Sequence, residues 1–181
     1  MEPKTLIILI ILVVLVFLSA FFSSCEITYS SVNKIKLKKK IAEGSKKATK
    51  AMNIVNQYSE VLSTILVGNN LVNVLASSLA TVIAVEKFGE DKGSMIATIV
   101  LTIVVLIFGE IIPKVFAKKY SLRMSLLYVT PFKFFRFIFF PITFVVTKGI
   151  NLISKIWTPK EVIYVHITIY FIDVFWYFII I

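Results

Sequence analysis

Three long stretches of this chain carry almost no charge, and they constrain its fold more than any other feature. They cover residues 6–25, 61–85 and 94–113, and the only charged side chain inside them is Glu110. Each is long enough to cross the hydrocarbon core of a bilayer as a helix, which takes about 20 residues. With 58% of its residues hydrophobic, the chain has too little polar surface for a water-soluble domain. The sequence therefore predicts an all-α integral membrane protein.

The first stretch has a second interpretation, as a signal peptide that is cleaved from the mature protein. Its apolar core is longer than the roughly 7–15 residues usual in such a peptide, and Lys4 is the only basic residue before it. We therefore expect a permanent membrane span that ends near Glu26.

Basic side chains flank these stretches unevenly, which indicates how they cross the membrane. Eight lysines and one acid lie between Lys34 and Lys50, and four more basic residues follow the third stretch, whereas residues 86–93 hold three acids and two lysines. Cytoplasmic connections are the ones enriched in Lys and Arg. We therefore predict three transmembrane helices with the N-terminus outside and the C-terminal side cytoplasmic. Their expected ranges are about residues 5–26, 61–85 and 94–117.

Residues 124–157 are apolar and aromatic, but prolines and basic residues divide them into pieces too short to span a bilayer. The interrupting residues are Pro131, Lys133, Arg136, Pro141, Lys148 and Lys155. Phenylalanines lie among these cations, as in segments that rest at a membrane surface. We predict juxtamembrane helices on the cytoplasmic face at about residues 32–58 and 124–157. A fourth spanning hairpin is the alternative.

The remaining residues, 158–181, form an apolar tail that suits either a further helix or a strand, and it stays unassigned. One Cys and one His, Cys25 and His166, are too few for a disulfide framework or a zinc site. The net charge of +10 would suggest nucleic acid for a soluble protein, but the lysines between Lys34 and Lys50 lie beside apolar stretches. We expect them to bind anionic lipid headgroups and not nucleic acid.

Glu110 needs compensation, because a carboxylate within a membrane span costs at least several kcal/mol. A bound cation would supply it, and an intrahelical pair with Lys114 is the alternative. Pro113 has no N–H for the carbonyl of Gly109, four residues back, so a free carbonyl is expected beside the carboxylate. An ordinary proline kink, with that carbonyl satisfied elsewhere, is the other interpretation.

Further oxygen donors lie in the first two stretches. Asn69 and Asn73 share one helix face, with Asn70 about 100° around, and Ser23 lies near the inner end of the first stretch. The asparagines either bind a metal or link helices by hydrogen bonds. Oxygen donors favour Mg2+ or Ca2+ over the softer transition metals. The candidate metal ligands are Ser23, Asn69, Asn70, Asn73, Gly109 and Glu110.

Three motifs, FFSSCE at 21–26, GNNLVN at 68–73 and FGEIIPK at 108–114, resemble in order and separation the transmembrane domain of the CNNM/CorB/CorC magnesium transporters. On this resemblance we assign residues 1–157 to such a domain. It implies Mg2+ transport, often described as Na+-coupled efflux, by a homodimer in the cell membrane. The implied ion site is lined by Ser23, Asn69, Asn73 and Glu110 and shaped by Gly109 and Pro113, with Asn70 as an additional candidate.

Other functions stay open at this point. A membrane scaffold, or a regulator of Mg2+ homeostasis that transports nothing, would use the same polar residues to bind helices together. An enzyme is not expected, because the sequence has no HExxH motif and no paired catalytic acids. The family normally continues into nucleotide-binding CBS domains, and the residues after Lys160 resemble none. The direction of transport and the coupling ion are not specified by these residues.

Overall fold

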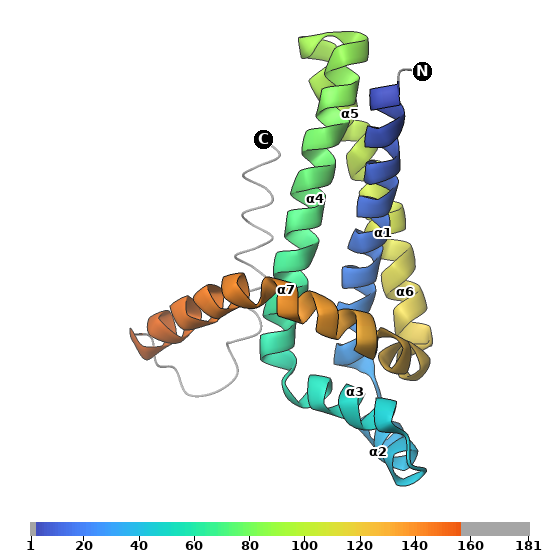
Figure 1. The fold of residues 1–181 in the computed structure, drawn as a ribbon, viewed down its shortest axis with the longest axis vertical. Coiled ribbons are helices and arrows are strands. Elements are labelled where there is room, and N and C mark those ends of the chain that lie inside the picture. The colour runs from blue at the N-terminus through green and yellow to red at the C-terminus, as the bar shows by residue number, and fades with distance from the viewer. Residues whose placement is uncertain (1–2, 157–181) are drawn as a thin grey trace.

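The computed structural model describes residues 3–156, with side chains through residue 149, and within this range the regular structure is entirely helical (Figure 1). The elements are α1 (Pro3–Ser31), α2 (Lys34–Ala42), α3 (Lys46–Asn56), α4 (Tyr58–Phe88), α5 (Glu90–Val104), the π-helix η1 (Val105–Ile111), α6 (Ile112–Lys119) and α7 (Ser121–Ile156). This confirms the all-α integral membrane class. The predicted apolar tail at residues 158–181 lies outside the described residues.

Three columns of helix form the bundle. In Figure 1, α1 runs down, α4 runs back up beside it, and α5, η1 and α6 descend again as one continuous helix of 30 residues. Large apolar side chains stay exposed along the upper part of α1, where lipid tails would cover them, among them Ile7, Ile10, Val13 and Phe17. We call the end that holds α2 and α3 the inner end, and the α4–α5 connection the outer end.

The predicted division of residues 124–157 at its prolines needs a correction at α7. Length and composition allow four helices to cross a membrane, and Ser121–Gly149 is the fourth. The prediction treated Pro131 and Pro141 as breaks, but α7 continues through both over 36 residues. A proline removes one backbone donor, and a helix with apolar flanks and good packing survives that loss. Unlike the other three, α7 crosses α1 and α4 near the inner end (Figure 1).

Aromatic side chains fix α7 in this crosswise position. Phe22 of α1 meets Phe135 and Phe139 of α7 at ring-centroid distances of 5.0 and 6.0 Å, and Phe132 packs against Tyr29 at 5.7 Å. Phe132 is completely buried, whereas Phe137 on the opposite side is 82% exposed. One face of α7 is therefore buried and the opposite face is exposed. Some of the phenylalanines that were expected at the membrane surface belong to the core instead.

The two short basic helices at the inner end are held by polar contacts. Asn33 caps α2 by accepting from the backbone N–H groups of Ile35 and Lys36, and Ser45 caps α3 by accepting from that of Ala48. The turn between them passes through Gly44 at φ 85°, a value that favours glycine. Both predicted spans next to this region extend beyond their expected ends, since α1 continues to Ser31 and α4 begins at Tyr58.

Candidate functional site

The three columns meet at Ser19 of α1. Its buried hydroxyl donates a hydrogen bond to the Asn69 side-chain oxygen on α4, with an Oγ–Oδ1 distance of 3.1 Å. On the third column, a Cβ added at Gly109 would lie 3.0 Å from the same hydroxyl oxygen. The missing side chain of Gly109 is therefore what lets η1 approach Ser19 so closely.

The helix containing Gly109 and Glu110 is wound as a π-helix at this point. Residues Val105–Ile111 form η1, and the backbone N–H of Ile112 donates to the carbonyl of Ile107, five residues back. Pro113, two residues after the end of η1, offers no N–H to the carbonyls four or five residues before it. Short π-helical segments inside α-helices are frequent at functional sites.

Glu110 is half-buried and is not paired with Lys114. The Lys114 ammonium lies 3.3 Å from a carboxylate oxygen of Glu26 on α1 instead, so the proposed intrahelical pair is not formed. Among the residues the structure describes, Glu110 has neither a hydrogen bond nor an ion pair. Its negative charge therefore remains available for a cation at the level of the Ser19–Asn69 contact.

Two predicted ligands, Ser23 and Asn73, are buried and carry unsatisfied oxygens. Ser23 is 1% exposed and Asn73 is 2% exposed, and within the described part of the chain neither the Ser23 Oγ nor the Asn73 Oδ1 has a hydrogen-bond partner. Thr28 Oγ1 is a third such atom, further toward the inner end. An unsatisfied buried polar atom costs about 1–3 kcal/mol, so its presence in a native fold calls for a ligand or water.

These two residues flank the Ser19–Asn69 contact on opposite sides. Ser23 lies one turn inward along α1, and Asn73 lies one turn outward along α4, because the two helices are antiparallel (Figure 1). A turn of four residues rises about 6 Å, which separates Ser23 and Asn73 by roughly 12 Å along the bundle. Ligands of a single Mg2+ lie within about 4.2 Å of one another, since each is about 2.1 Å from the ion. In this conformation the donors form a line rather than one shell.

Asn70 is the remaining candidate ligand on α4. Asn70 is half-buried on the neighbouring face of α4. Within the described residues, no group of three or more His, Cys, Asp or Glu side chains could hold a metal. Any cation here would therefore be held by hydroxyl, amide and carbonyl oxygens together with the single carboxylate of Glu110.

Polar contacts close the bundle on the inner side of this line. Besides the Glu26–Lys114 ion pair, the Ser24 hydroxyl donates to the Pro113 carbonyl at 3.4 Å, which joins α1 to α6. The Tyr58 hydroxyl donates to the backbone carbonyl of Glu26 at 3.4 Å, which joins α4 to α1. We call these three contacts the inner lock.

Sequence reasoning missed Ser19, the π-helix and the inner lock. Ser19 is the only polar residue in an otherwise apolar run, and its spacing of four from Ser23 was the one available signal. A π-helix depends on a shift in backbone hydrogen bonding, and nothing in the motif FGEIIPK specifies that shift.

Comparisons with known proteins show which family and which relatives this chain is similar to. The family described as the Cyclin M transmembrane N-terminal domain, CNNM, matches residues 10–163. A UPF0053 protein of Haemophilus influenzae is 43% identical over 116 residues, which are 64% of this chain and 27% of that protein. The UPF0053 inner membrane protein YfjD of Escherichia coli is 39% identical over 108 residues, 60% of this chain and 25% of that protein.

A plant relative matches more of the chain at lower identity. A DUF21 domain-containing chloroplastic protein of Arabidopsis thaliana is 33% identical over 138 residues, which are 76% of this chain and 21% of that protein. The matched part of the chain thus spans about a quarter of the length of these three relatives.

Proposed function

The chain belongs to the CNNM family and is a multi-pass protein of the plasma membrane, and on this premise we propose that it is the membrane domain of a Mg2+ transporter. We propose Na+-coupled efflux as the form of transport and a homodimer as the assembly. No catalytic step is part of this proposal.

One observation carries the proposal, namely the line of oxygen donors along the seam between α1 and α4. Its centre is the Ser19–Asn69 hydrogen bond, and the unpartnered oxygens of Ser23 and Asn73 lie a turn away on each side. Such atoms are costly inside a membrane span, where no bulk water can satisfy them. A cation passing along the seam would be bound by each of them in turn.

The donor types suit Mg2+ as the transported ion. Mg2+ prefers hard oxygen ligands and gives up its water reluctantly. Amide and hydroxyl oxygens replace the lost water, while Glu110, without a partner among the described residues, supplies the negative charge that offsets dehydration. Because the donors are spread over about two turns, the ion exchanges ligands in steps rather than leaving a complete cage at once.

Alternating access would require the inner lock to open. An ion at Ser19 reaches the inner side only if α6 moves away from α1, which breaks the Glu26–Lys114 pair and the Ser24–Pro113 contact. The π-helix carries Glu110 of the ion site, and Pro113, whose carbonyl belongs to the inner lock, follows two residues after it, so this segment is placed to act as the hinge for the movement.

A second function is favoured by the Ser19–Asn69 hydrogen bond itself. In a membrane scaffold or Mg2+-homeostasis regulator, that bond would only link α1 to α4, with an average worth of about 0.6 kcal/mol for bonds of this kind in membrane proteins. Such a protein would bind no ion at this level and would carry no flux.

Mg2+ flux in proteoliposomes that contain the purified chain distinguishes the two functions. We expect flux from the wild type with an outward Na+-coupled component, and at least about a hundredfold loss in Glu110→Ala and Asn73→Ala. Glu86→Ala and Asn53→Ala remove the same side-chain types at exposed positions and should retain flux. A folded wild type without flux, and without stabilisation by Mg2+, would instead support the scaffold.

A further inference from the structure

Arg136 of α7 makes a forked contact at the joint between α3 and α4. Its Nη1 donates to the Gln57 side-chain oxygen at 2.9 Å, and its Nη2 donates to a Glu60 carboxylate oxygen at 2.8 Å. Gln57 is the single residue between α3 and α4, and Glu60 lies in the first turn of α4. A guanidinium can bind two acceptors at once because its donors are arranged in a rigid plane. One side chain of α7 therefore holds the start of α4 at two points.

The same turn of α4 reaches the inner lock through Tyr58. Tyr58 follows Gln57 directly, and its hydroxyl donates to the backbone carbonyl of Glu26 on α1 at 3.4 Å. The Glu26 carboxylate in turn lies 3.3 Å from the Lys114 ammonium on α6. These contacts form an unbroken series from α7 through α4 and α1 to α6.

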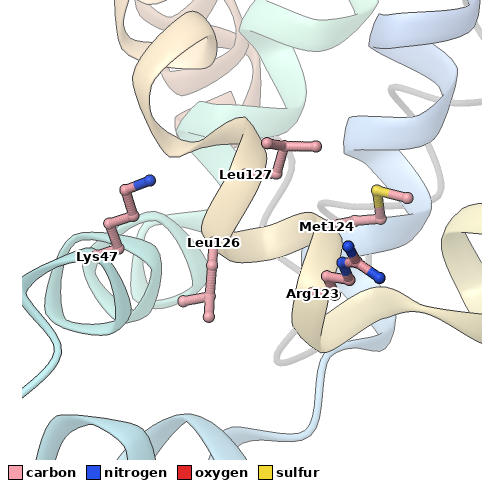
Figure 2. A pocket seen from close by; sticks show the side chains of 5 residues that line it. All are labelled: Lys47, Arg123, Met124, Leu126 and Leu127. Atoms are coloured by element: carbon pink, nitrogen blue, oxygen red, sulfur yellow. The ribbon is translucent and has the colours of Figure 1, made fainter.

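The first turns of α7 have no comparable charged link to α3. Figure 2 shows Lys47 of α3 and Arg123 of α7 on opposite sides of Leu126 and Leu127, at a groove of about 370 Å³. Both cations are exposed, and within the described residues neither takes part in an ion pair. In the part of the chain that the structure describes, the one ion pair between α7 and another helix is made by Arg136.

The Arg136 contact is not what holds α7 in place. The Arg136 side chain is 34% exposed and that of Glu60 is 61% exposed, and ion pairs this accessible to solvent add little stability. The crosswise position of α7 is fixed instead by buried rings, among them Phe132 and Phe139. A weak contact at this place can set the position of the first turn of α4 without being needed for folding.

From this series of contacts we propose that Arg136 is a positioning residue for the inner lock. It holds the first turn of α4 so that the Tyr58 hydroxyl stays on the Glu26 carbonyl. The lock is therefore fully closed only while α7 lies across the bundle with Arg136 on α4, and a shift of α7 loosens the contact between α4 and α1. This proposal rests on the proposed function in taking the inner lock as the gate of transport.

The test measures opening of the lock as the rate at which maleimide, added to inside-out vesicles, labels Cys25, which is completely buried beside Glu26. Arg136→Gln removes the forked contact. Arg123→Gln is the matched control, because it removes the same charge from an exposed position of α7 that has no ion pair among the described residues. Tyr58→Phe removes only the hydroxyl through which Arg136 is proposed to act.

We expect Arg136→Gln to be labelled about two- to fivefold faster than the wild type, and Arg123→Gln to be labelled at the wild-type rate. Both variants should unfold thermally almost like the wild type. Combined with Tyr58→Phe, Arg136→Gln should cause no further acceleration, because the contact it positions is already absent. Arg136→Lys should give an intermediate rate, because it keeps the charge but lacks the planar fork for two acceptors.

Equal labelling of Arg136→Gln and the wild type would overturn the proposal. Equal acceleration in both arginine variants would overturn it in favour of a general effect of charge. An Arg136→Gln effect of undiminished size in the Tyr58→Phe background would overturn it in favour of direct exposure of Cys25 by α7. Mg2+ flux separates these outcomes from failure of the proposed function: a wild type without flux overturns transport, while the labelling rates still decide the role of Arg136.

Discussion

The inner and outer halves of the bundle are held together by different means. In the inner half, side chains bridge the helices: Tyr29 donates to the Ser125 carbonyl at 3.4 Å, Arg136 binds Gln57 and Glu60 at 2.9 and 2.8 Å, and the inner lock adds three more contacts. In the outer half, the hydroxyls of Ser78, Thr81 and Thr98 donate within their own helices.

The outer half instead relies on small residues and direct backbone contact. A Cβ added at Gly93 would lie 2.6 Å from the carbonyl carbon and oxygen of Ala84 and from the Cα of Val85, so α4 and α5 touch along their backbones. Gly93 and Ala97 are the buried residues of α5 in the described structure. The candidate ion site lies at the boundary between these two halves. Polar contacts on its inner side can therefore rearrange while the closely packed α4–α5 hairpin on its outer side stays in place.

Gly93→Ala should have the largest effect on stability if this contrast is correct. The added methyl group meets backbone atoms, which cannot rotate away, so α4 and α5 must separate. We expect a loss of about 3 kcal/mol, measured by thermal unfolding in detergent followed by circular dichroism.

Gly149→Ala is the matched control, because among the described residues no atom outside its own turn of helix lies within 4 Å of the position its Cβ would take. Alanine is the better helix former there, so we expect no loss and a gain of up to about 1 kcal/mol. Similar stabilities of the two variants would show that backbone contact does not hold the outer half together.

Two identical substitutions one turn apart on α1 test the seam itself. Ser19→Ala removes a hydroxyl that has a partner and leaves Asn69 unsatisfied, so it should cost about 1 kcal/mol. Ser23→Ala removes a hydroxyl without a partner in the described residues, so it should gain about 1 kcal/mol in the absence of Mg2+.

Mg2+ should change this order in thermal unfolding. If Ser23 is a ligand, its alanine variant gains less stability from added Mg2+ than the wild type does. A Ser23→Ala variant that loses stability without Mg2+, and responds to Mg2+ like the wild type, would contradict the role of Ser23 as a free donor.

Particular residues show what the sequence could and could not predict. The spans follow from uncharged runs, which depend on composition alone, and the site candidates Glu110 and Asn69 follow from polarity inside those runs. The continuity of α7 does not follow from the sequence, because tertiary packing of Phe132 and Phe139 keeps the helix intact at Pro131 and Pro141. The Ser19–Asn69 contact could not be predicted for a related reason. It depends on the register between α1 and α4, and no local sequence pattern determines that register.

The inner lock is expected to produce the smallest effect on stability and the clearest effect on access. Lys114 and Glu26 are 36% and 23% exposed at the side chain, and a pair this accessible to solvent is worth less than about 1 kcal/mol. Lys114→Gln should therefore unfold almost like the wild type. Cys25, the single cysteine of the chain, is completely buried beside Glu26 and reports on opening of the lock.

We expect maleimide added to inside-out vesicles to label Cys25 about two- to fivefold faster in Lys114→Gln, the ratio that corresponds to about 0.5–1 kcal/mol. Lys40→Gln is the control, because it breaks the 2.7 Å pair with Glu43 at the C-terminal end of α2 and should leave the labelling rate unchanged. Equal rates in both variants and the wild type would mean that the ion pair does not close the inner side. Opening would then depend on the Ser24–Pro113 and Tyr58–Glu26 contacts, which carry no charge and would respond to neither substitution.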